Sequence, residues 1–250
     1  MPLERVEVSG RIFELELPEP AALLEEAVVG ESAGVSGWDP YWGLLWAAAP
    51  VTAGLLLRAA PRAERCLELG CGVGLVGLAG LAAGLSVTFS DQSGAAVAAS
   101  LGNAERNGLA GAAGLVFGWD DVPAVPGFDF IFASDVLYDR AGHEPLLNAL
   151  EHLLLAGGVV WIGDAGRQHA EVFARSAEGR GWRVRLYDER LRPLSRPQQL
   201  QYRLLVLDRL SAGSPVSGVG CRVSGVGCRG GAFGGDLTCG MWSGEFVCGA

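Results

Sequence analysis

The sequence predicts an α/β fold, a doubly wound and mostly parallel seven-stranded sheet with an antiparallel hairpin at one edge. Two observations support this prediction. Between residues 65 and 182, short apolar runs typical of strands alternate with helix-length runs, which implies right-handed crossovers and helices on both faces of a parallel sheet. The last two strand-like runs, 182–187 and 203–207, have no helix-length run between them, so they are expected to form the hairpin. A chain of 250 residues has room for one such domain.

An N-terminal extension, residues 1–37, precedes the alternating region. Residues 6–17 alternate apolar and polar side chains around a Ser-Gly pair, which predicts a β-hairpin. Residues 20–29 have the composition of a short helix, and residues 30–37 that of a loop. This extension is expected to be a hairpin followed by a helix.

The main domain is expected over residues 38–210. It opens with a segment dense in aromatic residues, 38–46, and an apolar helix to Arg58 should follow. Later elements are predicted from apolar runs of strand or helix length, bounded by glycine or acidic residues. The expected strands are 65–69, 86–90, 114–117, 128–133, 159–162, 182–187 and 203–207. The expected helices are 75–83, 93–106 with a C-cap at Asn107-Gly108, 143–155 and 168–178.

The last segment, residues 211–250, differs in composition from the rest of the chain. It is rich in glycine and contains the tandem repeat VSGVGCR at 216–222 and 223–229. Such a stretch cannot bury enough apolar surface to order itself, so a disordered tail is expected. Four of the six cysteines lie in this tail, and their spacing is wider than the CxxC pairs of a structural zinc site. We expect unpaired thiols and no metal.

The composition excludes several classes of partner. The formal net charge is −9 and the basic residues are all arginine, so binding to nucleic acid through phosphates is not expected. The N-terminus has early acidic residues and no apolar core, unlike a signal peptide. The longest apolar run, 44–57, is interrupted by Pro50 and Gly54 and is too short to span a bilayer. We expect a cytoplasmic monomer with no membrane partner.

The most informative motif is the glycine turn after the first strand of the main domain. Residues 66–69 lead through Glu68 into Gly70, Gly72 and Gly74. Glycines at this spacing let the backbone turn sharply and lie close to a bound nucleoside. A carboxylate at the strand end suits a ligand with an ammonium and a sulfonium better than one with a pyrophosphate. The motif therefore indicates S-adenosylmethionine as cofactor, and methyl transfer as the reaction.

A nicotinamide cofactor is the alternative, because residues 72–77 also fit GxGxxG. Asp91, at the end of the next strand, would accept hydrogen bonds from a ribose diol with either cofactor. Glu68, the tryptophan-rich segment before the turn and Asp135-Val-Leu-Tyr138 after the fourth strand favour S-adenosylmethionine. A third interpretation is that the glycines only allow a helix to pack closely on a strand.

Trp119 and Asp120 follow the third strand of the main domain. Ligands bind at the carboxyl ends of strands in open α/β sheets, so Trp119 is placed to lie against the adenine and Asp120 to accept from its exocyclic amine. Alternatively, Trp119 only covers the core, because stacking and core burial use the same ring.

Together these residues resemble a known family. Glu68-Leu-Gly-Cys-Gly-Val-Gly74, Asp91, Gly118-Trp119-Asp120 and Ala133-Ser-Asp-Val-Leu-Tyr138 are similar to motifs of the seven-β-strand, S-adenosylmethionine-dependent methyltransferases, which have a Rossmann-like fold. The acidic residue, two apolar residues and tyrosine after the fourth strand resemble the family-16 protein (lysine) methyltransferases. Asp39-Pro-Tyr-Trp-Gly-Leu-Leu-Trp46 resembles the branch that contains the electron-transfer-flavoprotein β-subunit lysine methyltransferase. The resemblance covers residues 38–207.

The resemblance implies roles for individual residues. Residues at the methionyl end of the cofactor would be Trp46, Gly70, Cys71 and Gly72, with Asp91 at the ribose, Trp119 at the adenine and the backbone of Ser134 nearby. Asp135 and Tyr138 would line the channel to the target and carry the catalytic function. The implied substrate is a lysine side chain of a partner protein.

The chemistry agrees with these roles. Methyl transfer from a sulfonium is an in-line displacement helped by positioning and desolvation, and a lysine amine, with a pKa of about 10.4, must arrive neutral or lose a proton on the way in. Asp135 can accept an N–H of that amine, and Tyr138 can offer its ring to a cation. Alternatively, Asp135 or Asp139 only caps a helix. The three histidines, His143, His152 and His169, are expected to be solvated helix residues.

Three other functions remain open from the sequence. The acceptor could be a small amine or heterocycle, the site could bind cofactor only for assembly, or the protein could be an NAD-dependent oxidoreductase.

Overall fold

The computed structural model of the chain describes residues 2–19, 40–195 and 200–209. The short helix predicted at 20–29, the loop at 30–37 and the tail at 211–250 lie outside the described residues. The same is true of both predicted domain boundaries. No helix of the described segments has the length and apolar character that crossing a membrane requires.

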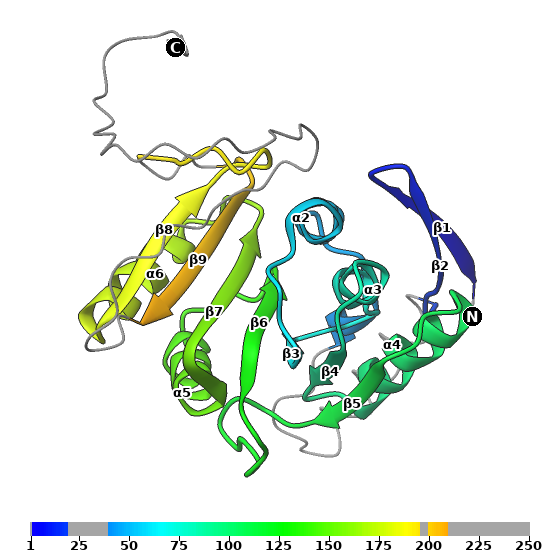
Figure 1. Ribbon diagram of the computed structural model, residues 1–250, viewed down its shortest axis with the longest axis horizontal. Coiled ribbons are helices and arrows are strands. Elements are labelled where there is room, and N and C mark those ends of the chain that lie inside the picture. The colour runs from blue at the N-terminus through cyan, green and yellow to red at the C-terminus, as the bar shows by residue number, and fades with distance from the viewer. Residues whose placement is uncertain (1, 20–39, 196–199, 210–250) are drawn as a thin grey trace, which may run out of the picture. The chain divides into compact units, whose positions relative to one another are not determined.

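The described part of the chain contains a seven-stranded sheet in the order β5-β4-β3-β6-β7-β9-β8 (Figure 1). Strand β9 pairs antiparallel with both β7 and β8, and all other pairs in the sheet are parallel, so the predicted fold class is confirmed. The chain moves outward from β3 to β5 and then returns to the other side of β3 at β6, and this reversal is where ligands bind in such sheets. The strands are β3 (Cys66–Leu69), β4 (Val87–Asp91), β5 (Ala112–Val116), β6 (Phe128–Ser134), β7 (Leu154–Asp164), β8 (Trp182–Tyr187) and β9 (Arg203–Arg209).

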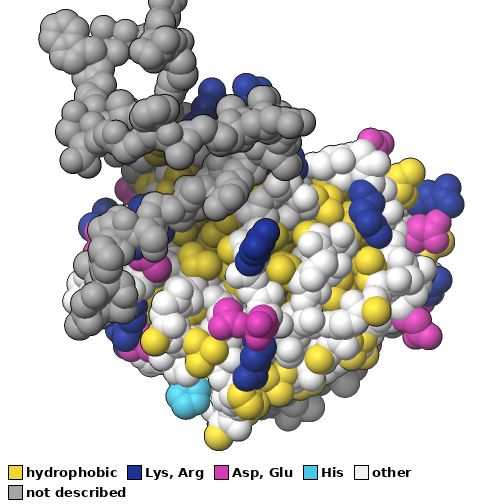
Figure 2. Space-filling view, viewed as in Figure 1, with side chains coloured by type: hydrophobic (Ala, Val, Ile, Leu, Met, Phe, Trp, Pro, Cys, Tyr) yellow, Lys and Arg dark blue, Asp and Glu magenta, His cyan; other side chains and the backbone are white. Residues whose placement is uncertain are grey.

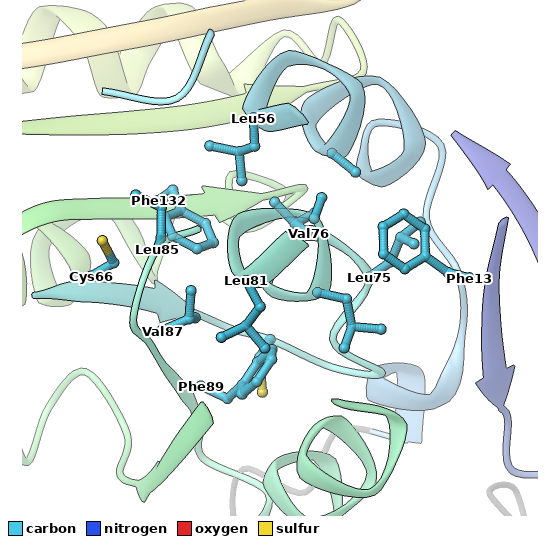
Figure 3. Close-up of a cluster of buried hydrophobic side chains, with 14 of the residues drawn as sticks. Phe13, Leu56, Cys66, Leu75, Val76, Leu81, Leu85, Val87, Phe89 and Phe132 are labelled. Carbon is cyan, nitrogen blue, oxygen red and sulfur yellow. The ribbon is translucent and has the colours of Figure 1, made fainter. Parts of the chain in front are cut away.

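Helices cover both faces of this sheet (Figure 1). The first face carries α2 (Ala49–Ala59), α3 (Leu75–Ala82) and α4 (Gly94–Arg106), and the second carries α5 (His143–Leu153) and α6 (His169–Gly179). Alternate strand residues supply the two cores, because successive side chains point to opposite faces. Phe130 and Phe132 belong to the first core, and Ile131 and Ala133 to the second. In Figure 3, Leu81, Val87 and Phe89 fill the space between α3 and the strands.

The N-terminal hairpin forms as predicted and packs on the first face. It consists of β1 (Leu3–Val8) and β2 (Arg11–Glu16), with positive φ at both turn residues, as a tight hairpin turn requires. Asn103 of α4 accepts a hydrogen bond from the Glu16 backbone N–H at 2.7 Å. Phe13 is fully buried and lies beside α3 (Figure 3). The hairpin is therefore part of the same core as the sheet.

Two elements differ from their predicted form. The helix predicted to reach residue 155 ends at Leu153, because Leu154 is already extended and pairs with Phe128 of β6. Strand β7 accordingly starts earlier than the predicted residue 159. In the C-terminal hairpin, β9 lies between β7 and β8, so the final described strand is inside the sheet and β8 forms the edge.

The surface carries charges of both signs. Figure 2 shows basic and acidic side chains at the edge and in the middle of one face, with apolar side chains between them. Arg5 and Glu14, 2.8 Å apart on the two strands of the N-terminal hairpin, form one such pair. Pairs of this kind at the surface contribute little to stability.

Candidate active site

A cavity of about 580 Å³ opens at the carboxyl ends of the central strands. This size lies within the usual range for small-molecule sites, roughly 300–1,000 Å³. Every site residue predicted from the sequence lines it: Trp46, Glu68, Gly70, Cys71, Gly72, Asp91, Trp119, Asp120, Ser134, Asp135 and Tyr138. The structure thus brings them together, while the role of each stays a prediction.

The glycine turn forms the floor of the cavity. Gly72 has a φ of 52°, and an ideal Cβ placed there would lie 2.7 Å from the backbone oxygen of Trp42. Trp42 belongs to the 3-10 helix η1 (Pro40–Gly43). Trp42 therefore lies directly on the turn, and a side chain at Gly72 would push it away. We call residues 41–48, which include Trp42, the aromatic strap.

Glu68 borders the cavity, but one of its oxygens already has a partner. Its Oε2 accepts a hydrogen bond from the backbone N–H of Gly77 at 3.0 Å, in the first turn of α3. Burial raises the pKa of the Glu68 carboxyl well above its ordinary value, the Gly77 N–H lowers it, and the charge of Asp91 raises it. This carboxyl ties the strand to the helix, and its contact with a ligand's ammonium stays a prediction.

Close packing accounts for one glycine of the motif. A Cβ at Gly77 would overlap both the Phe89 ring and Oε2 of Glu68. The packing interpretation therefore fits Gly77, whereas Gly70 and Gly72 line the cavity.

Asp91 is held in place by backbone donors. Its Oδ2 accepts from the N–H of Gly72 at 3.1 Å, and its Oδ1 accepts from the N–H of Ser93 at 2.9 Å. The carboxylate thus both braces the turn and faces the ligand space.

Aromatic rings form the walls of the cavity. Trp46 is exposed, and its Nε1 donates to the backbone oxygen of Tyr41 at 3.2 Å. Trp119 is half-buried, packs against the second core and lines the cavity, so its contact with the adenine stays a prediction. Tyr138 is 53% exposed at the rim. Two aromatic side chains at the rim are therefore open to solvent.

Asp135 is a buried carboxylate in an unusual backbone conformation. Its φ is 59°, a left-handed value that few residues other than glycine adopt. Its backbone N–H donates to the Gly163 oxygen at 2.8 Å, its Oδ2 accepts from the Ala48 N–H at 2.8 Å, and its Oδ1 pairs with the guanidinium of Arg167. The carboxylate thereby fastens the end of the aromatic strap to strand β6.

The helix-cap interpretation of these acidic residues is wrong. Helix α5 begins at His143 with Gly142 as its N-cap, and no side chain caps it. Asp139 instead accepts from the Ala141 N–H at 3.0 Å in the preceding turn. Neither Asp135 nor Asp139 is at the helix start, because α5 begins at His143, four residues beyond Asp139, where the sequence predicts it.

The sequence analysis missed an arginine at the site and the pair that supports it. Arg167 lines the cavity, and its guanidinium carbon lies 5.7 Å from the centre of the Trp46 ring. Behind it, Asp164 at the end of β7 and Arg203 of β9 are fully buried, with Nε of Arg203 3.1 Å from Oδ1 of Asp164. An acidic residue at a strand end, as at Asp91, is the signal that could have indicated this pair.

The histidines do not all match their prediction. His143 is buried against Phe173, and burial lowers the pKa of its imidazole, so the expectation of a solvated residue is wrong there. His152 is exposed, and His169 is half-buried with Nδ1 3.0 Å from the backbone oxygen of Tyr138. His143 is enclosed because α6 packs across the start of α5.

The two cysteines near the turn are buried free thiols. Burial raises the pKa of the Cys66 thiol to about 12, so it stays protonated. Within the described segments, no group of His, Cys, Asp or Glu side chains is arranged to hold a metal ion.

The donor set fits a nucleoside with a cationic tail. The cavity combines a glycine-rich turn, a carboxylate held at the end of β4 by backbone hydrogen bonds and flat aromatic walls. A glycine-rich turn lets a ligand approach the protein backbone closely, and a carboxylate at a strand end binds a ribose diol. Aromatic walls can stack on an adenine ring. The residues present therefore fit the cofactor that the sequence predicts.

Comparison with known proteins adds a family and a fold. The sequence matches the model of a family described as lysine methyltransferase over residues 39–176, more than half of the chain. No curated protein sequence matches it.

Several solved structures are similar in fold. A TehB-like SAM-dependent methyltransferase from Corynebacterium glutamicum has a TM-score of 0.55 at 22% identity, over 77% of this chain and 100% of that one. The CcbJ methyltransferase from Streptomyces caelestis has a TM-score of 0.51 at 15% identity, over 66% and 99%. The glycopeptide N-methyltransferase MtfA, complexed with S-adenosyl-L-methionine, has a TM-score of 0.53 at 13% identity, over 65% and 94%.

Proposed function

The chain belongs to the lysine methyltransferase family, whose members are S-adenosylmethionine-dependent, and from this premise we propose that it methylates the side-chain amine of a lysine in a partner protein. The methyltransferase activity follows from the family. The lysine acceptor, the nitrogen target and the roles of single residues are our proposal.

One observation carries the proposal: a carboxylate and two aromatic rings adjoin the glycine turn in one cavity. Asp135, Trp46 and Tyr138 all line the same space as Gly70 and Gly72. Carboxylates and aromatic faces attract ammonium groups. An amine bound there would lie next to the cofactor's methionyl end, which the glycine turn is proposed to hold.

The residues of the chain have separate tasks in this reaction. When bound, the cofactor supplies a methyl group on a positively charged sulfur. Asp91 holds the ribose diol, Trp119 covers the adenine, and Oδ1 of Asp135 accepts an N–H from the acceptor amine and directs its lone pair. Trp46 and Tyr138 exclude water from the amine, which favours its neutral, nucleophilic form. The amine enters as an ammonium and loses one proton to solvent at the open rim before its lone pair attacks the methyl group.

A small-molecule amine is the second candidate acceptor. The aromatic strap favours it, because Trp42 lies on the glycine turn and the strap narrows one side of the cavity. Against it, Tyr138 is 53% exposed and Trp46 is 40% exposed at the rim. Two aromatic residues open to solvent offer a surface that a protein loop can cover, so we favour the protein substrate.

The test separates cofactor binding from turnover. We expect S-adenosylhomocysteine to bind both the wild type and Asp135→Asn in calorimetry, with similar affinity. With radiolabelled S-adenosylmethionine and a lysate of the source cell, Asp135→Asn should lose at least about a hundredfold in rate, as expected for a positioned polar group. The exposed Asp121→Asn serves as the matched control and should behave as wild type.

Two results would contradict this proposal. Binding of NAD without binding of S-adenosylhomocysteine would overturn the cofactor. Label found only on small molecules, with none on lysine after digestion of the labelled proteins, would overturn the acceptor.

A further inference from the structure

The side chain of Arg167 occupies a site built for a cation. Its Nη1 pairs with Oδ1 of Asp135, and its guanidinium lies over the Trp46 ring, with 5.7 Å between the guanidinium carbon and the ring centre. All three residues line the cavity. A carboxylate beside an indole face is the arrangement that proteins use to bind ammonium and guanidinium groups. In this structure the chain's own arginine fills that position.

The backbone of Arg167 is fixed, whereas its side chain is the movable part. Oδ1 of Asp164 accepts from the N–H groups of Gly166 at 2.9 Å and Arg167 at 2.8 Å. On the other side, Nη2 of Arg203 donates to the backbone oxygen of Arg167. The side chain of Arg167 is 25% exposed, but that of Arg203 is only 1% exposed. The guanidinium of Arg167 can therefore move toward solvent, whereas that of Arg203 is enclosed.

The charges at this site are balanced in pairs. Arg203 neutralises Asp164 at 3.1 Å, and Arg167 neutralises Asp135. Glu171 is the next carboxylate, 4.0 Å from Nη1 of Arg203 and one-third exposed. An ammonium brought to Asp135 would add a third cation to two buried anions unless one cation leaves. Since an unpaired buried charge is costly, the two cations should exchange in one event.

We propose that Arg167 stands in for the substrate's ammonium group and is displaced by it. This inference rests on the proposed function, because it assigns the acceptor side of the same cavity. The entering ammonium donates to Oδ1 of Asp135 as the guanidinium moves toward solvent, and no covalent bond changes.

The exchange makes the site selective for cations. A neutral group of the same shape cannot replace Arg167, because Asp135 would then be left buried without a counter-charge. Without a substrate, Asp135 keeps its partner and the aromatic strap stays fastened through Ala48. The Arg167 guanidinium therefore neutralises Asp135 when no substrate is bound, and it makes the site accept only a positively charged group in its place.

The test uses n-butylammonium as a probe for a lysine side chain and 1-pentanol as its neutral counterpart. Both are titrated into the full chain by calorimetry, with and without saturating S-adenosylhomocysteine. We expect n-butylammonium to bind Arg167→Gln at least about tenfold more tightly than wild type, the weight of one charge-assisted hydrogen bond. Arg167→Lys, which keeps a cation, and Arg175→Gln, an exposed change in the following helix α6, should match wild type. 1-Pentanol should not distinguish the four proteins.

The outcomes for the two proposals are distinct. Equal or weaker n-butylammonium binding by Arg167→Gln would overturn the exchange, even if S-adenosylhomocysteine binds normally. Failure of S-adenosylhomocysteine to bind wild type would overturn the proposed function, and the titration without it would still decide about Arg167. If Arg167→Gln does not fold, the Nε–H resonance that Arg167→Lys lacks is followed in wild type. It should shift on adding n-butylammonium, and a static resonance would overturn the proposal.

Discussion

Some site residues can be predicted from the sequence because they lie at the end of a strand. Others take their place only through tertiary packing. Asp91 and Asp135 could be found from the sequence because each follows a buried strand, and parallel strands end at one edge of the sheet. The partner of Asp135 could not, because Arg167 reaches it only through the pairing of β6 with β7. Glu68 shows a third case: its position was predictable, but its bond to Gly77 depends on how closely α3 packs.

The buried Glu68 should make stability depend on pH. Because its pKa is raised in the folded state, its contribution is complete below the unfolded pKa and is lost as the pH rises through the folded pKa. Glutamine stays neutral and can still accept from Gly77. Glu68→Gln should therefore match wild type near pH 4, just below the unfolded pKa of about 4.3, and be more stable at pH 8, by about 1.4 kcal/mol per unit of pKa difference. Urea unfolding at both pH values measures this.

The same change at the exposed Glu64 is the control and should not alter the pH dependence. A Glu68→Gln effect that is equal at both pH values would contradict the prediction. Loss of S-adenosylhomocysteine binding in Glu68→Gln would instead support the ligand contact that the sequence suggests.

At the scale of elements, the sequence predicted the type of nearly every helix and strand described, but not all their ends. Strand β7 begins at Leu154 because pairing with β6 competes successfully with helix propensity there. The place of β9 between β7 and β8 depends on pairing partners far apart in the chain, which local patterns do not specify. The sequence also did not show how closely α3 packs on the strands. A glycine in such a motif can make room either for a ligand or for a neighbouring side chain.

Gly77 tests how closely α3 packs. In Gly77→Ala the new methyl group would overlap the Phe89 ring and the Glu68 carboxylate. We expect a loss of about 1–3 kcal/mol in unfolding free energy, typical of overpacking, measured by denaturant unfolding. The control is Gly102→Ala in α4, where a Cβ meets nothing within 4 Å. That change should raise stability by up to about 1 kcal/mol through helix propensity. Equal effects of the two changes would contradict the close packing.

At the scale of the whole molecule, alternation of strand and helix was enough to predict the doubly wound sheet, because few topologies satisfy right-handed crossovers. What the pattern did not reveal is that the N-terminal hairpin belongs to the same core. Phe13 packs with residues of α3 and β4 in the first hydrophobic core. Its burial depends on Asn103 and Asn107, which bind the β2 backbone from α4. Hydrogen bonds between groups so far apart in the sequence cannot be predicted from local sequence patterns.

The hairpin should therefore contribute to global stability. Phe13→Ala removes a fully buried ring and should cost about 3–5 kcal/mol, seen as a shift of one cooperative denaturant transition. Ile12→Ala is the matched control, because Ile12 is next in sequence but exposed, and it should change stability by less than about 0.5 kcal/mol. A separate, early transition in Phe13→Ala with the main one unmoved would contradict a shared core.

The insertion of β9 affects the order in which the site can be assembled during translation. The turn and carboxylate proposed to hold the cofactor, Gly70 to Asp91, leave the ribosome early. Arg203, which fixes the backbone of Arg167, is supplied by β9. The nascent chain can therefore shape the nucleoside side of the cavity first, whereas the acceptor side is completed only after the last described strand has emerged and entered the gap beside β7.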